Sequence, residues 1–341
     1  MKKITSGILI LIIGTALFTI SCKKHKDDVV PASNTSDPIA AMYTSQQNSK
    51  QRFTVNPIRD TVLTGINGTK LYIGGNTLCT SSGQPVTGDV TIELKELTHF
   101  SDMVLNNAPT VSNGKLLKSG GSFYVAANQN GTPLTLAAHA NYFIEVAAPY
   151  GTSDSMKVFT GKDSSGVIAW TPVETDTVNT NIEIPDTTAN KSPYDSAAYF
   201  TYYNTSWAIR NDAYTYMVKC TSFGWINADY FIEMNYSDLC EQTVICDPSL
   251  NLDIAQTSVY YLLPATNSCA SLYATSVGFI FKGGIPNKES IKIVALANKD
   301  GKCYISVMDH FVNCDDTKTV VLYFTEIQES DIPAALEKIN I

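Results

Sequence analysis

Residues 90–95, with the sequence VTIELK, alternate apolar and polar side chains, and Tyr142, Ile144 and Val146 repeat this pattern around Glu145. A period of two residues is typical of a β-strand with one buried face. We therefore expect antiparallel strands in both places, each packed with one side on a core.

Turn signals separate such segments at short intervals between about residue 52 and residue 173. They are Gly65-Ile66-Asn67-Gly68, Gly74-Gly75-Asn76, Ser82-Gly83-Gln84-Pro85, Asn113-Gly114, Gly120-Gly121, Asn130-Gly131 and Ser164-Ser165-Gly166. Many short strands joined by glycine-rich turns predict an antiparallel β-sandwich over residues 51–173, with one short helix near residues 100–105.

The composition changes in residues 174–193, which are polar and contain no aromatic residue. We interpret this stretch as a linker and expect a domain boundary before Tyr194. Candidate strands follow, so residues 194–341 are predicted to form a second antiparallel β-sandwich. These candidate strands are Tyr214–Cys220, Ser258–Leu263, Val277–Phe281, Ile291–Leu296, Cys303–Val307 and Thr319–Phe324.

A short helix is predicted to close the chain, with Ser330 as its N-cap. Ile332, Leu336 and Ile339 fall at i, i+4 and i+7, so they form one apolar stripe that can dock on a sheet. The predicted fold is therefore all-β: two antiparallel β-sandwich domains joined by a polar linker, with a short C-terminal helix.

Residues 1–21 resemble the signal peptide of a lipoprotein. Two lysines precede residues 7–20, an apolar or small stretch that is shorter than the roughly 20 residues needed to span a bilayer. Ser21-Cys22 then resembles a lipobox, although Thr19 stands where leucine is usual. We expect cleavage before Cys22 and attachment of lipid to its sulfur. An ordinary signal peptide with an incidental cysteine is the alternative.

Residues 22–50 are predicted to form a flexible tether, because their polar composition offers little apolar surface to offset the entropy lost on ordering. One short helix is expected around residues 39–43. Lys26-Asp27-Asp28 resembles the acidic export signals of surface-displayed Bacteroidota lipoproteins. A plain solvated tether is the alternative. The lipid would hold the protein at the outer membrane, on either its periplasmic or its surface face.

Composition and motifs narrow the class of function. The formal net charge of −8 argues against a nucleic-acid partner, which requires basic surfaces. The sequence has no nucleophile-elbow, Walker, dinucleotide or zinc-protease motif, and Ser112–Lys115 matches S-x-x-K without its companion motifs. His99, His139 and His310 are interpreted as surface residues. We expect no enzyme activity, no metal and no cofactor.

Seven cysteines remain besides Cys22, and six of them lie in residues 194–341. Exported proteins fold where disulfides persist, and short loops favour Cys240 with Cys246 and Cys303 with Cys314. The alternative is that these cysteines stay reduced and pack as small hydrophobic residues.

An aromatic run at the start of the second predicted domain is a candidate ligand platform, because exposed tyrosine and tryptophan rings stack on sugars or anchor a protein partner. The candidate residues are Tyr199, Tyr202, Tyr203 and Trp207. The alternative, which we favour, is that this run seals the core of the sandwich.

Two passages resemble known exported proteins. Residues 68–73, GTKLYI, and residues 82–94, SGQPVTGDVTIEL, are similar to the opening strands of ZU5-like β-sandwiches. Residues 223–230, FGWINADY, resemble a G-W-I-N-x-D signature of large exported lipoproteins of Bacteroidota. The resemblance implies a location and an architecture, and it carries over no catalytic residues.

The leading hypothesis is a lipid-anchored protein of the cell envelope that acts as a non-catalytic binding or scaffolding module, with a protein or glycan partner. One alternative is a carbohydrate-binding accessory lipoprotein of a glycan-uptake system. Another is a cryptic hydrolase whose active site is assembled from distant segments.

Overall fold

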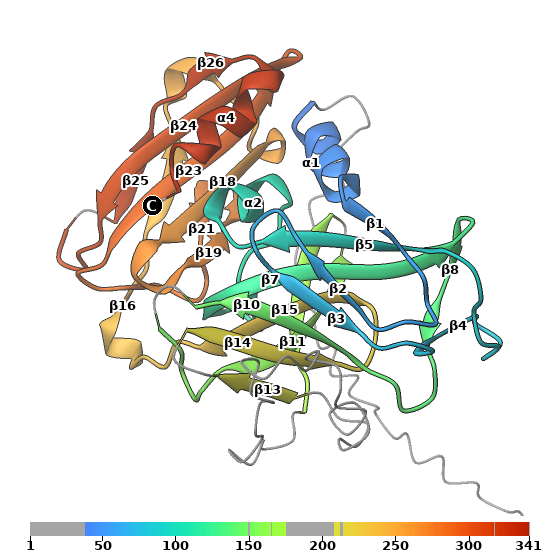
Figure 1. The fold of residues 1–341 in the computed structure, drawn as a ribbon. Helices are drawn as coiled ribbons and strands as arrows, with labels where there is room; N and C mark the ends of the chain where they lie inside the picture. The colour runs from blue at the N-terminus through green and yellow to red at the C-terminus, as the bar shows by residue number, and fades with distance from the viewer. Residues whose placement is uncertain are drawn as a thin grey trace, which may run out of the picture. The chain divides into compact units, whose positions relative to one another are not determined.

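Strands make up most of the structure, which is therefore all-β, as the alternating sequence predicts (Figure 1). The structure is a computed structural model that describes residues 38–148, 151–164, 166–174, 208–211, 214–316 and 318–340. Within these residues the strands form two sandwiches, accompanied by three short α-helices. No helix in the described ranges has the length and apolar character needed to cross a membrane.

The N-terminal sandwich has a larger sheet with the strand order β1-β5-β7-β15-β11-β12, and β6 and β8 pair with β7. These strands are β1 (Gln51–Val55), β5 (Val90–Leu97), β6 (Val111–Ser112), β7 (Lys115–Gln129), β8 (Thr132–Pro133), β11 (Lys157–Ser164), β12 (Val167–Pro172) and β15 (Gly224–Phe231).

The facing sheet of this sandwich has the order β13-β14-β10-β3-β2. Its strands are β2 (Thr61–Thr64), β3 (Lys70–Ile73), β10 (Tyr142–Ala147), β13 (Ala208–Asn211) and β14 (Thr215–Cys220), and a separate pair joins β4 (Leu78–Cys79) to β9 (Thr135–Leu136). The alternating residues of β5 and β10 pack inward as expected, with Ile92 and Ile144 fully buried in the same core.

Three strands of the N-terminal sandwich come after the stretch predicted as a linker. β15 pairs with β7 on one side and with β11 on the other, and β14 pairs with β10. The prediction assigns residues 214–231 to the second sandwich, whereas their pairing completes both sheets of the first. A two-residue period identifies a strand, but it does not identify the strand beside it.

The C-terminal sandwich packs a sheet of order β19-β18-β23-β24-β26 against a smaller sheet of order β20-β21-β17-β25. Within the smaller sheet, β17 and β25 are parallel. The strands are β17 (Thr243–Cys246), β18 (Thr257–Leu263), β19 (Ser268–Ser271), β20 (Tyr273–Thr275), β21 (Gly278–Ile280), β23 (Ser290–Lys299), β24 (Lys302–Phe311), β25 (Thr319–Leu322) and β26 (Thr325–Ile327), with a further pair β16 (Leu239–Cys240) and β22 (Ile285–Pro286).

A layer of three helices covers the other face of the larger C-terminal sheet (Figure 1). They are α1 (Pro38–Asn48), α2 (Phe100–Leu105) and α4 (Ile332–Glu337). The helices expected around residues 39–43 and 100–105 are thus confirmed, and α1 lies within the segment predicted as a tether. The stripe of Ile332, Leu336 and Ile339 is buried as predicted. The N-cap is Asp331 rather than Ser330, because a 3₁₀ turn at Glu329–Asp331 precedes the helix.

The two sandwiches contact each other directly and belong to one compact unit. The Thr110 amide donates to the Cys269 carbonyl at 2.7 Å, and the Ser268 hydroxyl donates to the Leu117 carbonyl at 2.6 Å. Because β7 and the segment before it meet β19 in this way, groups from both sandwiches come together near residues 117–120.

Candidate functional site

A β-bulge in β7 marks the place where the two sandwiches and the helical layer converge. The pairing of β7 with β15 changes register between Asn227 and Asp229, opposite Gly120 and Gly121. A Cβ on Gly120 would lie 2.9 Å from the Ala228 carbonyl oxygen, and Gly121 has φ +127°. Both positions therefore require glycine, and the bulge bends the strand. The pair expected to form a turn lies inside a 15-residue strand instead.

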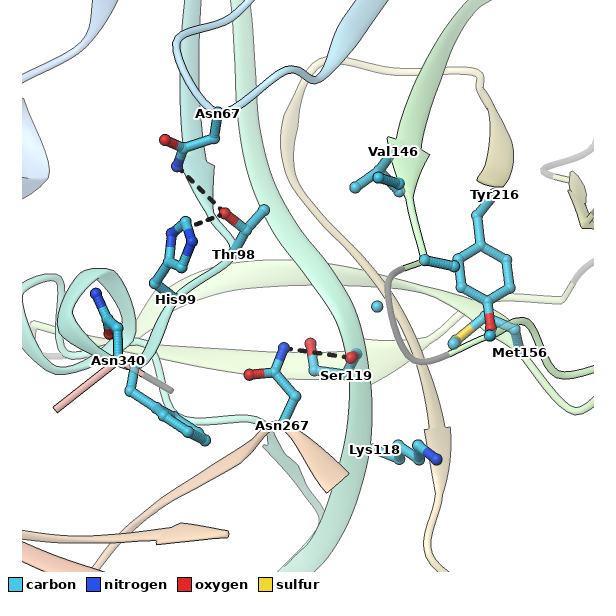
Figure 2. A pocket seen from close by; sticks show the side chains of 15 residues that line it. Asn67, Thr98, His99, Lys118, Ser119, Val146, Met156, Tyr216, Asn267 and Asn340 are labelled. Carbon is cyan, nitrogen blue, oxygen red and sulfur yellow. Dashed lines mark hydrogen bonds between the residues drawn. The ribbon is translucent and has the colours of Figure 1, made fainter. Parts of the chain in front are cut away.

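A cleft of about 330 Å³ opens beside this bulge. Most of its walls come from the N-terminal sandwich: the turn before β3, β7, the end of β10, the segment before β11, and β14. The start of α2, the turn before β19 and the segment after α4 complete the lining. Figure 2 shows Asn67, Thr98 and His99 on one side, Val146, Tyr216 and Met156 on the opposite side, and Ser119, Asn267 and Lys118 between them. The volume lies at the lower end of the range of roughly 300–1,000 Å³ typical of small-molecule sites.

Three asparagine side chains in the cleft are held by hydrogen bonds to the protein, and Figure 2 shows those of Asn67 and Asn267. Asn67 donates to the Thr98 hydroxyl at 3.2 Å, and Asn267 donates to the Ser119 carbonyl at 3.4 Å. Asn340 bonds to Ser101 through both side-chain atoms, at 3.0 and 2.8 Å. These polar groups are therefore positioned before any ligand arrives, which reduces the ordering entropy lost on binding.

A buried carboxylate holds the turn that carries Asn67. Glu96 accepts from the backbone amides of Asn67 and Thr69 at 3.1 and 3.0 Å, and from the Gln51 side chain at 2.7 Å. A Cβ on Gly65 would lie 2.3 Å from a Glu96 oxygen, so only glycine leaves room for this carboxylate. Glu96 thus has a structural role in keeping one wall of the cleft in place.

The basic side chains of the cleft are His99 and Lys118. His99 Nδ1 lies 3.4 Å from Asp102, which also accepts from the His99 backbone amide at the start of α2. Burial raises the pKa of the Asp102 carboxyl, although its contacts with His99 oppose the shift. Lys118 Nζ lies 5.9 Å from the centre of the Tyr230 ring and makes no ion pair with a described residue. Among the described lining residues there is no aspartate or glutamate.

A buried polar cluster lies behind the cleft at the bulge. Asp229 and Asn227 are fully buried, and Asn227 donates to an Asp229 oxygen at 2.5 Å. Burial raises the pKa of Asp229 to about 8, against the opposing hydrogen bonds from Ser119 and Asn227. Asp229 is therefore mostly protonated at neutral pH, so it places no full negative charge behind Ser119.

The residues predicted for lipid and ligand lie outside the described part of the chain. These are Cys22 and the aromatic residues Tyr199, Tyr202, Tyr203 and Trp207. Among the described residues, no group of three or more histidine, cysteine, aspartate or glutamate side chains is placed to hold a metal ion.

The structure corrects the predicted disulfide pairing. Cys240 is bonded to Cys314, with a Cα–Cα distance of 5.0 Å, so neither the predicted Cys240–Cys246 bond nor the predicted Cys303–Cys314 bond is formed. Asn287 bridges the two segments that carry the bonded pair, since its amide donates to the Asp238 carbonyl and its side chain accepts from the Cys314 amide. Pairing by short loops fails because strand order, not sequence distance, brings cysteines together.

Sequence reasoning missed the cleft. Asn67, Lys118, Asn267 and Asn340 come from four distant segments, and none belongs to a recognised motif. The signal that was present is Ser119-Gly120-Gly121-Ser122, since paired glycines inside a strand pattern indicate a bulge or a close backbone approach.

The comparisons with known proteins add no family. No protein-family model matches the chain, and no curated protein matches it. The cleft is therefore interpreted from its own geometry.

Proposed function

We propose that this chain is a non-catalytic binding protein of the cell envelope, held to a membrane by lipid on Cys22, and that its ligand site is the cleft beside the β7 bulge. The observation that carries the proposal is the set of fixed polar groups that line this cleft. A concave site with a few convergent polar groups and apolar walls is the usual form of a small-molecule site.

The hydrogen bonding inside the cleft favours binding over turnover. The hydroxyl nearest the bulge, that of Ser119, accepts a hydrogen bond from the Gly121 backbone amide at 3.2 Å. His99 pairs with Asp102 on the opposite side of the cleft from Met156 and Tyr216. A nucleophile needs a base within hydrogen-bond reach, and no such bond joins Ser119 to His99.

The membrane part of the proposal comes from the sequence, in which a short apolar stretch ends at Ser21-Cys22. Metabolic labelling of the expressed chain with a radiolabelled fatty acid tests it directly. We expect label on the native chain and none on Cys22→Ala. Label retained by the variant, or absent from both chains, would refute the lipid anchor.

The ligand site is tested by blocking the cleft in the full chain. Asn67 is exposed at the rim, so Asn67→Trp fills the cleft with little effect on the core. Ile66→Trp is the matched control, because Ile66 occupies the same turn and is 85% exposed. Binding would be sought by thermal shift against fractionated glycan, peptide and metabolite pools.

We expect at least one pool to stabilise the native chain and Ile66→Trp but not Asn67→Trp. Stabilisation that survives in Asn67→Trp places the site elsewhere. Conversion of a pool component by the native chain would overturn the non-catalytic assignment.

A further inference from the structure

We propose that the cleft binds an acidic saccharide, with a uronate carboxylate at Lys118 and sugar hydroxyls at the wall formed by Asn67, Thr98 and His99. This inference rests on the proposed function, because it names the ligand class of the same cleft. Four properties of the cleft support it: its charge, its hydrogen-bonding groups, its apolar wall and its rim.

The charge of the cleft is opposite to that of the whole chain. The formal net charge is −8, yet the described lining residues include a lysine and a histidine and no carboxylate. Lys118 has no described ion-pair partner within 4.0 Å that a ligand would have to displace. An anion in the cleft can accept charge-assisted hydrogen bonds from the lysine ammonium, while the carboxyl groups of Asp102 and Asp154 lie beside His99 and Tyr216, outside the lining itself.

The wall opposite Met156 suits hydroxyl groups. The side-chain Nδ2 of Asn67 donates to Thr98 Oγ1, which also lies 3.2 Å from His99 Nδ1 (Figure 2). This arrangement leaves the side-chain oxygen Oδ1 of Asn67 and the ring nitrogen Nε2 of His99 without a described hydrogen-bond partner. A sugar hydroxyl both donates and accepts, and this wall offers groups of both kinds.

The facing wall is apolar. Val146 and Met156 lie opposite the hydroxyl-binding wall and provide a surface for the C–H face of a sugar ring (Figure 2). Met156 is 7% exposed and has an adaptable thioether side chain, so it can follow the contour of a ring.

One exposed aromatic residue follows a residue of the cleft wall across a backbone hydrogen bond. Tyr214 is 78% exposed, and its carbonyl accepts from the amide of Ala148, a residue of the cleft wall, at 2.7 Å. An exposed tyrosine beside the cleft can stack on a second sugar unit, which favours an oligosaccharide over a single sugar.

The experiment compares tetragalacturonate with its methyl ester, which keeps the saccharide and removes the charge. Binding of each to the full chain in detergent micelles would be measured by calorimetry. Lys118→Met removes the ammonium and keeps the length of the side chain. Lys115→Met is the matched control, because Lys115 is exposed on the same strand and does not line the cleft.

We expect the native chain to bind tetragalacturonate at least tenfold more tightly than the ester, since a hydrogen bond to a charged group contributes more than a neutral one. Lys118→Met should lose this preference, and Lys115→Met should keep it. Circular dichroism and thermal unfolding establish that both variants are folded.

Three results would overturn the inference. Equal binding of the acid and the ester would show that the cleft takes a saccharide without using the charge. Equal binding of an acetylated tetraglutamate peptide would show an anion site that is not specific for saccharides. Absence of binding by all three probes would exclude acidic saccharides.

The proposed function is tested separately from this ligand class. If none of the three probes binds, but one of the pools stabilises the native chain and not Asn67→Trp, only the ligand class is wrong. If no pool does so, the proposed function fails as well.

Discussion

The larger sheets of the two sandwiches differ in the side chains that they bury on the face turned away from the sandwich core. The larger sheet of the N-terminal sandwich buries polar residues on its outer face, including Lys95, Asn227 and Asp229, beside an apolar cluster that contains Phe159 and Trp170. The larger sheet of the C-terminal sandwich instead buries apolar residues under three helices, and a disulfide closes the domain. The candidate site lies beside the buried polar residues of the N-terminal sandwich. The comparison indicates that the apolar helical layer stabilises the C-terminal sandwich. The buried polar residues of the N-terminal sandwich instead position the groups of the cleft, and their burial lowers its stability.

The largest effect is expected from the disulfide. Replacing both Cys240 and Cys314 by serine removes a cross-link between residues 74 positions apart and should lower the free energy of unfolding by roughly 4 kcal/mol. Urea denaturation checks this value. The matched control is Cys246→Ser, which alters a reduced, half-buried cysteine. Peptide mass mapping should find Cys240 linked to Cys314, and recovery of a Cys240–Cys246 peptide would contradict the structure.

The second effect concerns the pH dependence of the N-terminal sandwich. The pKa of Asp229 is about 8 in the folded chain, above its usual 3.8, so the folded state binds more protons than the unfolded state between these values. Stability contributed by this group should therefore fall as the pH rises from about 4 to about 8, by at most about 1.4 kcal/mol per pH unit.

Asp229→Asn tests this sign, since it keeps the shape of the side chain and removes the titration. We expect the variant to gain stability relative to the native chain between pH 5 and pH 8, as measured by urea denaturation at both values. A constant difference between the two chains would show that Asp229 does not titrate in this range.

The third effect distinguishes the part of the larger C-terminal sheet that the helices cover from the part of the same face that is exposed to solvent. Val294 and Val307 are cross-strand partners, but Val294 is fully buried and Val307 is 45% exposed. Val294→Ala should lower the free energy of unfolding by about 2 kcal/mol, because it removes two buried methyl groups and leaves a cavity. Val307→Ala should change it by under about 0.5 kcal/mol. Equal effects in thermal unfolding would mean that the helical layer does not cover this face as described.

The smallest effect is expected at the ion pair beside Val307. Lys292 lies 2.6 Å from Asp309, whose side chain is 82% exposed. Asp309→Ala should therefore lower the free energy of unfolding by at most about 0.5 kcal/mol, because exposed pairs are well solvated in both states. The difference should shrink further in 1 M salt. A loss above 1 kcal/mol would place this pair in a less solvated environment than the structure gives it.

Much of the local structure follows from the sequence. The alternation at residues 90–95 and around Glu145 identifies β5 and β10, and the stripe at Ile332, Leu336 and Ile339 identifies the closing helix and its buried face. These features depend on contacts between near neighbours and on one apolar surface, and both are visible in a short window of sequence.

Only the tertiary structure decided which sheet each strand joins, which cysteines pair and where the polar groups of the cleft meet. β14 and β15 complete the first sandwich although they follow the polar stretch, and Cys240 reaches Cys314 through the order of strands. Asn67, Lys118, Asn267 and Asn340 converge because two sandwiches and a helical layer pack at one bulge. Such contacts join residues far apart in the chain, and their free energy depends on the whole packed assembly, so no local pattern of residues specifies them.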